Sequence, residues 1–164
     1  AVLPSFSGNH PASLDLLFVL AEWVTERAKG EALLRRVRLA IVTVLARQRD
    51  FLGALTLLDD MQKSNGDGVV WSLTGLMSLE LGDVARAARA FQEAEPLLLL
   101  QNNQTAVHMN AGLLLFAQGQ YELAIVQFDA ILAAAGNVEN SFSVAATNNK
   151  AVCLLFTKQL GQAV

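Results

Sequence analysis

Residues that could carry catalysis or bind a metal ion are few in this sequence and lie far apart. The one cysteine is Cys153, and the two histidines, His10 and His108, are almost a hundred residues apart. The sequence has no local Ser-His-Asp or Cys-His signature, no glycine-rich phosphate loop and no pair of histidines at metal-ligand spacing. We therefore predict that the chain is not an enzyme and has no catalytic, cofactor-binding or metal site.

Cys153 and His108 each have a structural interpretation that is simpler than a chemical one. Cys153 lies in the apolar run 151–155 of a predicted helix, which favours a buried, inert thiol over a nucleophile. His108 occupies the place in its repeat that Trp71 occupies in the preceding one, so a packing or helix-edge role is favoured over a ligand role.

A group of arginines could instead recognise a protein partner. The group comprises Arg35, Arg36, Arg38, Arg47 and Arg49, with Glu31 and Asp50 nearby. A solvated helix face is the simpler interpretation of such a basic zone, and a site for an acidic partner through Arg36 and Arg47 is the alternative.

Composition limits the class of protein. The chain has 164 residues, of which 53% are hydrophobic and 16% charged, so it is too apolar for disorder and can bury a sizeable core. A formal net charge of −3 argues against nucleic acid as a partner. The longest apolar stretch near the start, 14–24, is too short and too polar to span a membrane. Residues 1–11 lack an initiator Met and a signal-peptide layout, so we expect a loose lead-in and a fragment.

An internal repeat organises the rest of the chain. After Trp71, anchor residues follow at intervals of four, seven, five, four and three: Gly75, Gly82, Ala87, Phe91 and Ala94. The intervals of seven, five, four and three recur downstream in Gly112, Gly119, Ala124, Phe128 and Ile131. A weaker copy reads Val42, Arg49, Ala54, Leu58 and Met61, and an incomplete one reads Ala151, Lys158 and Ala163. The first anchors are 33, 37 and 39 residues apart, which predicts one helical hairpin per repeat.

Close packing explains the types of residue at these anchors. A small residue in a first helix, such as Gly75, Gly112 or Ala151, lets the partner helix approach, and Ala87 or Ala124 does so from the other side. Phe91 and Phe128 lie four residues beyond those alanines and can pack against the next hairpin. Glycine at positions 82 and 119 permits the left-handed backbone that ends many helices.

The repeat register predicts where the helices lie. We expect a helix over 12–29, then pairs over 31–48 and 50–63, 68–81 and 84–96, and 104–117 and 121–135, followed by 141–157 and a new helix from 160. Pro96 should end or kink its helix, with 97–100 buried in a long connection. The tract 64–68 should be a loop, and 135–140 another. We divide the chain into a lead-in and helix over 1–30 and a repeat array over 31–164 that is truncated within its last repeat.

These anchors resemble the tetratricopeptide (TPR) repeat family across residues 31–164. Trp71, Gly75, Ala87 and Phe91 match its diagnostic positions, and Gly112, Tyr121, Ala124 and Phe128 match again. Thr74 and Ser78 depart from the usual Leu and Tyr, and proline is missing at the expected ends of the helix pairs. The resemblance implies an all-α right-handed superhelical solenoid of about three and a half repeats plus an N-terminal helix, acting as a non-catalytic scaffold for protein–protein interaction.

Three stretches carry a closer resemblance, to TPR subunits of TRAPP vesicle-tethering complexes. They are Leu81–Glu95, Met109–Leu132 and Thr147–Phe156. The resemblance implies a subunit of a large complex that activates a Rab-family GTPase in traffic between endoplasmic reticulum and Golgi and in autophagy. Its partners would be other protein subunits, without a small-molecule substrate, and its location would be cytoplasmic, peripheral to the endoplasmic reticulum and Golgi.

In such an array the first helices of successive repeats line the concave side, so equivalent residues form ladders along a groove. The ladder one residue after the first anchors comprises Thr43, Leu76, Leu113 and Val152, and the ladder four residues after them comprises Ala46, Leu79, Phe116 and Leu155. Most of the groove should therefore be apolar. We predict that the groove binds a partner through Met109, Asn110, Leu113, Phe116, Asn148 and Asn149. The asparagines could hold the backbone of an extended peptide, or could merely cap or bridge neighbouring helices.

Two other TPR functions remain as alternatives. A chaperone adaptor grips a terminal carboxylate with paired cations on successive first helices, but the sequence has no Lys or Arg between Arg89 and Lys150. A substrate-holding TPR domain of a larger enzyme is also possible, because an asparagine-lined groove resembles that of the protein O-glycosyltransferase.

Overall fold

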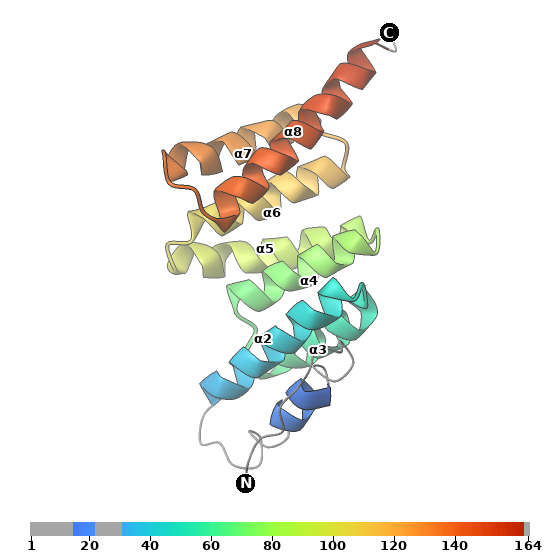
Figure 1. Ribbon diagram of the computed structural model, residues 1–164, viewed down its shortest axis with the longest axis vertical. Helices are drawn as coiled ribbons and strands as arrows, with labels where there is room; N and C mark the ends of the chain where they lie inside the picture. Colours follow the sequence, from blue (N-terminus) through green and yellow to red (C-terminus); the bar gives the residue numbers. More distant parts are fainter. Residues whose placement is uncertain (1–14, 22–30, 163–164) are drawn as a thin grey trace. The chain divides into compact units, whose positions relative to one another are not determined.

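The computed structural model describes residues 15–21 and 31–162, which form helices and turns without a strand (Figure 1). Residues 15–21 are helical; the rest of the helix expected over 12–29 lies outside the described residues. Further along, the helices are α2 (Glu31–Arg47), α3 (Phe51–Asn65), α4 (Gly68–Glu80), α5 (Val84–Leu100), α6 (Gln104–Ala117), α7 (Tyr121–Ala135) and α8 (Ser141–Gln162). The predicted all-α class, a solenoid of helical hairpins, is confirmed.

Contacts divide the chain into two compact units that meet within α3, the first ending at Met61 and the second beginning at Gln62. The first unit contains α2 and most of α3, and the second contains α4 to α8. In the second unit each helix packs on its neighbours in the sequence, and α6 also contacts both α4 and α8. The expected division between 1–30 and 31–164 stays a prediction.

The same turn closes each hairpin, as the repeat register predicted. Gly82 and Gly119 adopt φ angles of 78° and 76°, and the next amide donates to the carbonyl five residues back, as from Asp83 to Ser78 at 2.9 Å. Arg49 adopts the same left-handed conformation, with φ 61°, although an L side chain is strained there. The turn therefore follows the repeat rather than the local preference of the residue.

The second-helix anchors are buried in all three complete hairpins. They are Ala54, Leu58 and Met61 in α3, Ala87, Phe91 and Ala94 in α5, and Ala124, Phe128 and Ile131 in α7. A spacing of four and three places such residues on one helical face, which each hairpin presents to its core.

Two glycines let aromatic rings pack against the first helices. A Cβ added to Gly75 would lie 2.2 Å from the Phe91 ring, and one added to Gly112 would lie 2.6 Å from the Phe128 ring. Any larger residue at these positions would displace the ring. The predicted role of Gly75 and Gly112 in close approach is confirmed.

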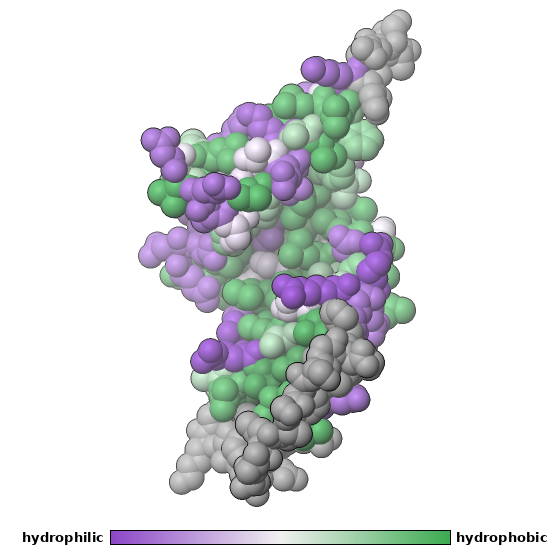
Figure 2. Space-filling model, viewed as in Figure 1, coloured by the Kyte–Doolittle hydropathy of each residue, from purple (hydrophilic) through white to green (hydrophobic). Residues whose placement is uncertain are grey.

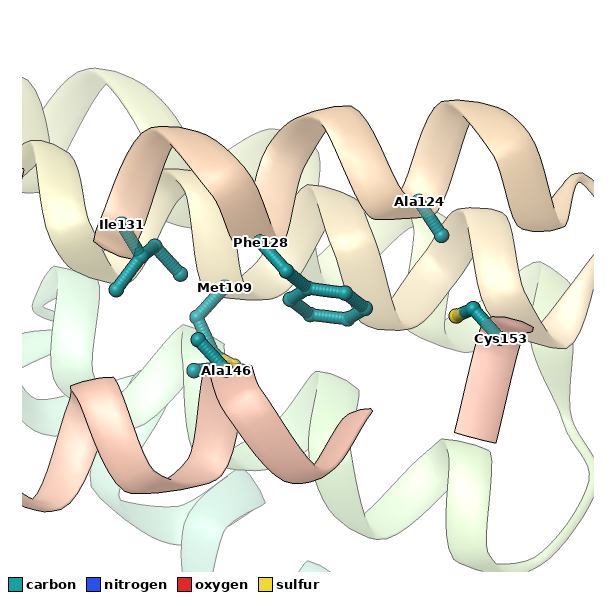
Figure 3. Packing of buried hydrophobic residues seen from close by; sticks show 6 residues of the cluster. All are labelled: Met109, Ala124, Phe128, Ile131, Ala146 and Cys153. Atoms are coloured by element: carbon teal, nitrogen blue, oxygen red, sulfur yellow. The ribbon is translucent and has the colours of Figure 1, made fainter. Parts of the chain in front are cut away.

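The last three helices share a core. Phe128, Ile131 and Ala124 of α7 cluster with Met109 of α6 and with Ala146 and Cys153 of α8 (Figure 3). The Phe128 ring points away from α7 between the other two helices. The prediction that Phe128 packs against the next hairpin is therefore confirmed.

Pro96 does not end its helix, so the first of the two predicted outcomes, an end or a kink, is wrong. α5 continues to Leu100, and only three residues connect it to α6. Beyond the proline, Leu98 is buried and lies so close to Gly68 of α4 that a Cβ there would meet its side chain at 2.9 Å. Pro96 lies on the exposed side of α5 and leaves one helical hydrogen bond unmade, and the packing of Leu98 stabilises the turn beyond it. Leu99 and Leu100 are exposed, so the expected burial of 97–100 is also wrong except at Leu98 and, in part, Leu97.

The loop predicted over 64–68 is shorter than expected. Only Gly66 and Asp67 lie outside the helices, and the Asp67 carboxylate accepts hydrogen bonds from the amides of Val69 and Val70 at 2.9 and 3.0 Å. This side-chain cap lets α4 begin directly after α3.

The helix expected from 160 does not form. α8 runs on through Lys158, which occupies the place of Gly82 and Gly119, to Gln162. Lys158 stays helical where Arg49, at the equivalent place, is left-handed, and continuing the helix keeps the backbone hydrogen bonds of this stretch. The expected pairing of Ala163 with Ala151 lies outside the described residues.

Candidate partner-binding groove

A pocket of about 340 Å³ opens between the first helices of the second unit. It is lined by Leu76, Leu79 and Glu80 of α4, Leu113, Phe116 and Ala117 of α6, Phe128 of α7, and Asn149 and Val152 of α8. We call this pocket the groove. Three successive first helices thus line one surface, with a ring from a second helix between them.

The repeat register predicted much of this lining. Leu76, Leu113 and Val152 each follow the small anchor of their helix by one residue, and Leu79 and Phe116 follow it by four. Leu155, the next member of the second ladder, lies outside the lining and is 61% exposed.

Asn110 is not available to a partner peptide, which corrects its predicted place in the groove. It is buried in α6, and its Nδ2 donates a hydrogen bond of 2.8 Å to Oγ of Ser72 in α4. The Ser72 hydroxyl in turn donates to the carbonyl of Gly68 at 2.7 Å. Asn110 therefore bridges two first helices, which is the alternative role that the sequence left open.

Asn149 is the equivalent residue of α8, and the structure places it in the groove. Its Nδ2 approaches Sδ of Met109 at 3.8 Å, and Met109 corresponds in the register to Ser72. A thioether is a weak acceptor, so this half-buried amide keeps capacity for another partner. Met109 itself is in the core rather than in the groove, contrary to expectation.

Asn148 lies elsewhere, which is a further correction. It lines a more polar hollow beside the α7–α8 turn, together with Glu139, Ser143 and Thr147. One residue along a helix turns the side chain by about 100°, so adjacent asparagines meet different surroundings.

Three aromatic rings form one end of this region. Phe116 of α6 lies 5.4 Å from Tyr121 of α7 and 5.7 Å from Phe156 of α8, and Tyr121 stacks on Phe156 at 5.0 Å. The predicted packing role of Tyr121 is confirmed, and its partners tie three helices together.

The groove is apolar with an acidic edge. The only charged residue in its lining is Glu80, and among the described residues none pairs with that carboxylate. Lys150 of α8 follows the lining residue Asn149 in the sequence, and its Nζ lies 2.6 Å from Oδ1 of Asp129 in α7.

A family model, described as Tetratricopeptide repeat, matches residues 39–98 and 109–164. The two matched segments cover more than half of the chain. The chain belongs to the tetratricopeptide repeat family. Both segments begin three residues before a small first-helix anchor, Val42 in one case and Gly112 in the other, which agrees with the register drawn from the sequence. No curated protein and no solved structure matches the chain at a significant level.

The last helix of this TPR protein carries an exposed apolar face. Ala151 occupies the place of Gly75 and Gly112 but is exposed, so the structure shows no ring packed over it among the described residues. Leu154, Leu155 and Phe156 are exposed as well, and Figure 2 shows apolar side chains gathered over this half of α8.

The basic zone lies in the first unit, with four of its five arginines on α2 and Arg49 in the turn that follows. Arg36 and Arg47 are both exposed, and their separation of eleven residues, about three helical turns, puts them on one face. The Arg49 guanidinium lies 5.6 Å from the centre of the Phe51 ring.

The other chemically capable residues are integrated into the packing. Trp71 is half-buried and packs against Gly66, where an added Cβ would lie 2.9 Å from the indole Nε1. Nδ1 of His108 lies 2.9 Å from Oε1 of Gln127. Burial raises the pKa of the Cys153 thiol above its ordinary value, which keeps the thiol protonated at neutral pH. Among the described residues no cluster of metal-ligating side chains occurs and no helix is long and apolar enough to span a membrane.

Sequence reasoning missed Glu80 and Ala117 in the lining. Each follows the small anchor of its helix by five residues, one place beyond the ladder at four. The same place is Phe156 in α8 and Arg47 in α2.

Proposed function

We propose that this TPR protein is a non-catalytic interaction scaffold that holds a segment of another protein chain in the groove. The observation that carries the proposal is the lining itself. Side chains from α4, α6 and α8 form a continuous apolar surface that is partly exposed, which is a usual mark of a binding site in a soluble protein. TPR repeats in general bind protein partners, which supports the same role.

A finer proposal is that the chain belongs to subunit twelve of the TRAPP vesicle-tethering complex. It is supported by the resemblance of Leu81–Glu95, Met109–Leu132 and Thr147–Phe156 to that subunit's C-terminal TPR region. The scaffold would then serve activation of a Rab-family GTPase in endoplasmic reticulum to Golgi traffic and in autophagy. Its place would be the cytoplasmic side of these membranes.

The alternative roles have less support. A chaperone adaptor needs cations in the groove, and none lines it. A substrate-holding domain of an enzyme would use paired asparagines, but Asn110 is already bonded to Ser72.

Affinity purification of the intact protein tests both levels of the proposal. We expect wild type to recover tethering-complex subunits, and Val152→Asp in the groove to lose at least some of them. Val126→Asp makes the same chemical change on the exposed side of α7, outside the lining, and should recover them all. Recovery of a chaperone alone, lost when Arg36 and Arg47 are both changed to Ala, would contradict the tethering role. Equal recovery by Val152→Asp and wild type would contradict the role of the groove.

A further inference from the structure

The polar groups of the groove decide what conformation an occupant can have. Glu80 and Asn149 are the lining residues whose side chains can form hydrogen bonds, since the others are apolar. Leu76, Leu113 and Val152 lie inside α4, α6 and α8, where the helix uses its own backbone groups, and only Glu80 and Ala117 of the lining end their helices. Asn110, the other half of the expected pair of amide clamps, donates to Ser72 instead.

An extended segment would therefore lose hydrogen bonds in this groove. Its amides and carbonyls would leave water without receiving partners, and each buried group left unpaired would weaken binding. An α-helix satisfies its own backbone, so it can lay an apolar face on an apolar surface without that cost. The composition of the lining thus favours a helical occupant.

The charge at the edge of the groove favours an occupant that carries a basic group. The exposed carboxylate of Glu80 has no ion-pair partner among the described residues. It lines the same pocket as the Phe116 ring, whose face also attracts a cation. The sequence contributes no Lys or Arg between Arg89 and Lys150 that could compete for this place.

We infer that the groove binds an amphipathic α-helix from another protein, whose apolar stripe contacts Leu76, Leu113 and Val152 and whose flanking Lys or Arg pairs with Glu80. The inference rests on the proposed function and adds the conformation and charge of the partner segment. Apolar residues at positions i, i+3 or i+4, and i+7 of that helix would form the stripe. Because the charge pair lies at an exposed edge, it contributes to selectivity more than to affinity.

The first step of the test is a selection from an unbiased library of displayed sixteen-residue peptides (a length of about four helical turns). The intact wild-type protein is the bait, with Val152→Asp and Val126→Asp as groove and control variants. We expect wild type and Val126→Asp to enrich peptides with apolar residues at helical spacing, no central proline and a flanking Lys or Arg. Val152→Asp should not enrich them.

The second step measures affinities of an enriched peptide as a synthetic molecule. Glu80→Lys should weaken its binding about fivefold, the size expected of one exposed ion pair. Glu93→Lys makes the same charge change on the exposed side of α5 and should leave binding unchanged. A peptide with its basic residue changed to Glu should recover affinity for Glu80→Lys. A proline in the centre of the peptide should abolish binding.

Each other outcome overturns a defined part of the account. Groove-dependent peptides that tolerate proline or alternate apolar and polar residues would overturn the helical occupant and leave the proposed function standing. Groove-dependent helices without a basic residue, or equal affinities for Glu80→Lys and Glu93→Lys, would overturn the role of Glu80. No peptide sensitive to Val152→Asp would overturn the proposed function as well. Self-association in sedimentation that is lost in Val152→Asp would identify a second copy as the occupant and contradict a partner protein.

Discussion

α6 and α8 occupy equivalent places in successive repeats, yet the structure uses their equivalent residues differently. In α6 the small anchor Gly112 lies under the Phe128 ring, and Asn110 is buried against Ser72. In α8 the small anchor Ala151 is exposed, and Asn149 lies half-buried beside the sulfur of Met109. The repeat register therefore determines where a side chain lies, while the helix opposite determines what it does there.

This difference has a physical cause in the neighbouring residues. A first helix gains a buried polar bridge only where the preceding first helix offers an acceptor, which Ser72 does and Met109 does poorly. It gains a covered apolar face only where a second helix brings a ring to its small anchor. Among the described residues α6 has both partners, whereas α8 has only the weak sulfur acceptor and no ring over its anchor, so its asparagine and its apolar face remain for other contacts.

The largest contrast should come from removing large apolar side chains at the two helices. Phe128 is 0% exposed between α6 and α8, so Phe128→Ala should lower the free energy of unfolding by about 3–5 kcal/mol. Leu155→Ala, on the exposed face of α8, should change it by less than about 0.5 kcal/mol. Urea unfolding followed by circular dichroism measures both. Similar losses for the two variants would mean that the exposed face of α8 is packed in solution.

The second-largest difference in stability between changes in α6 and in α8 should come from enlarging their small anchors. Gly112→Leu places side-chain atoms in the space of the Phe128 ring and should cost about 1–3 kcal/mol of unfolding free energy, despite the better helix propensity of leucine. Ala151→Leu should be neutral within about 0.5 kcal/mol because its side chain meets solvent. The same unfolding measurement compares them, and a neutral Gly112→Leu would show that the ring moves aside freely.

The two asparagines give a smaller and sharper test. Asn110→Ala leaves the buried Ser72 hydroxyl without its donor and should cost about 1–2 kcal/mol, whereas Asn149→Ala should cost less than about 0.5 kcal/mol. A double-mutant cycle with Ser72→Ala should give a coupling energy of about 1 kcal/mol for Asn110. A coupling energy near zero would mean that the amide and the hydroxyl do not bond.

The smallest contrast concerns the ends of the two helices. Gly119 closes α6 with φ 76°, so Gly119→Ala should cost about 1 kcal/mol for the left-handed conformation. Lys158 takes the same place in α8 but continues the helix, so Lys158→Ala should be neutral or slightly stabilising. Thermal melts of both variants check this, and an equal loss at both positions would indicate that α8 turns at Lys158 after all.

Periodicity predicted the helices and the faces of this protein well because it depends only on the chain itself. Intervals of seven, five, four and three follow from helix geometry and turn length, and the buried anchors in α3, α5 and α7 confirm them. Failures occurred where the outcome depends on a residue far away in the sequence. The packing of Leu98 on Gly68 stabilises α5 beyond Pro96. The hydrogen bond to the Ser72 hydroxyl keeps the Asn110 side chain out of the groove. No local pattern shows which acceptor or which packing partner lies opposite a given residue.

Site-specific photo-crosslinking in the intact protein, in its native complex, tests most directly whether the groove is the interaction surface. A benzophenone amino acid would replace Val152 in the groove or Val126 on the exposed side of α7. We predict crosslinks from position 152 to one helical segment of a partner subunit, with few or none from position 126. Crosslinks from position 126 alone, or none from position 152, would contradict the account and place the interaction on another face.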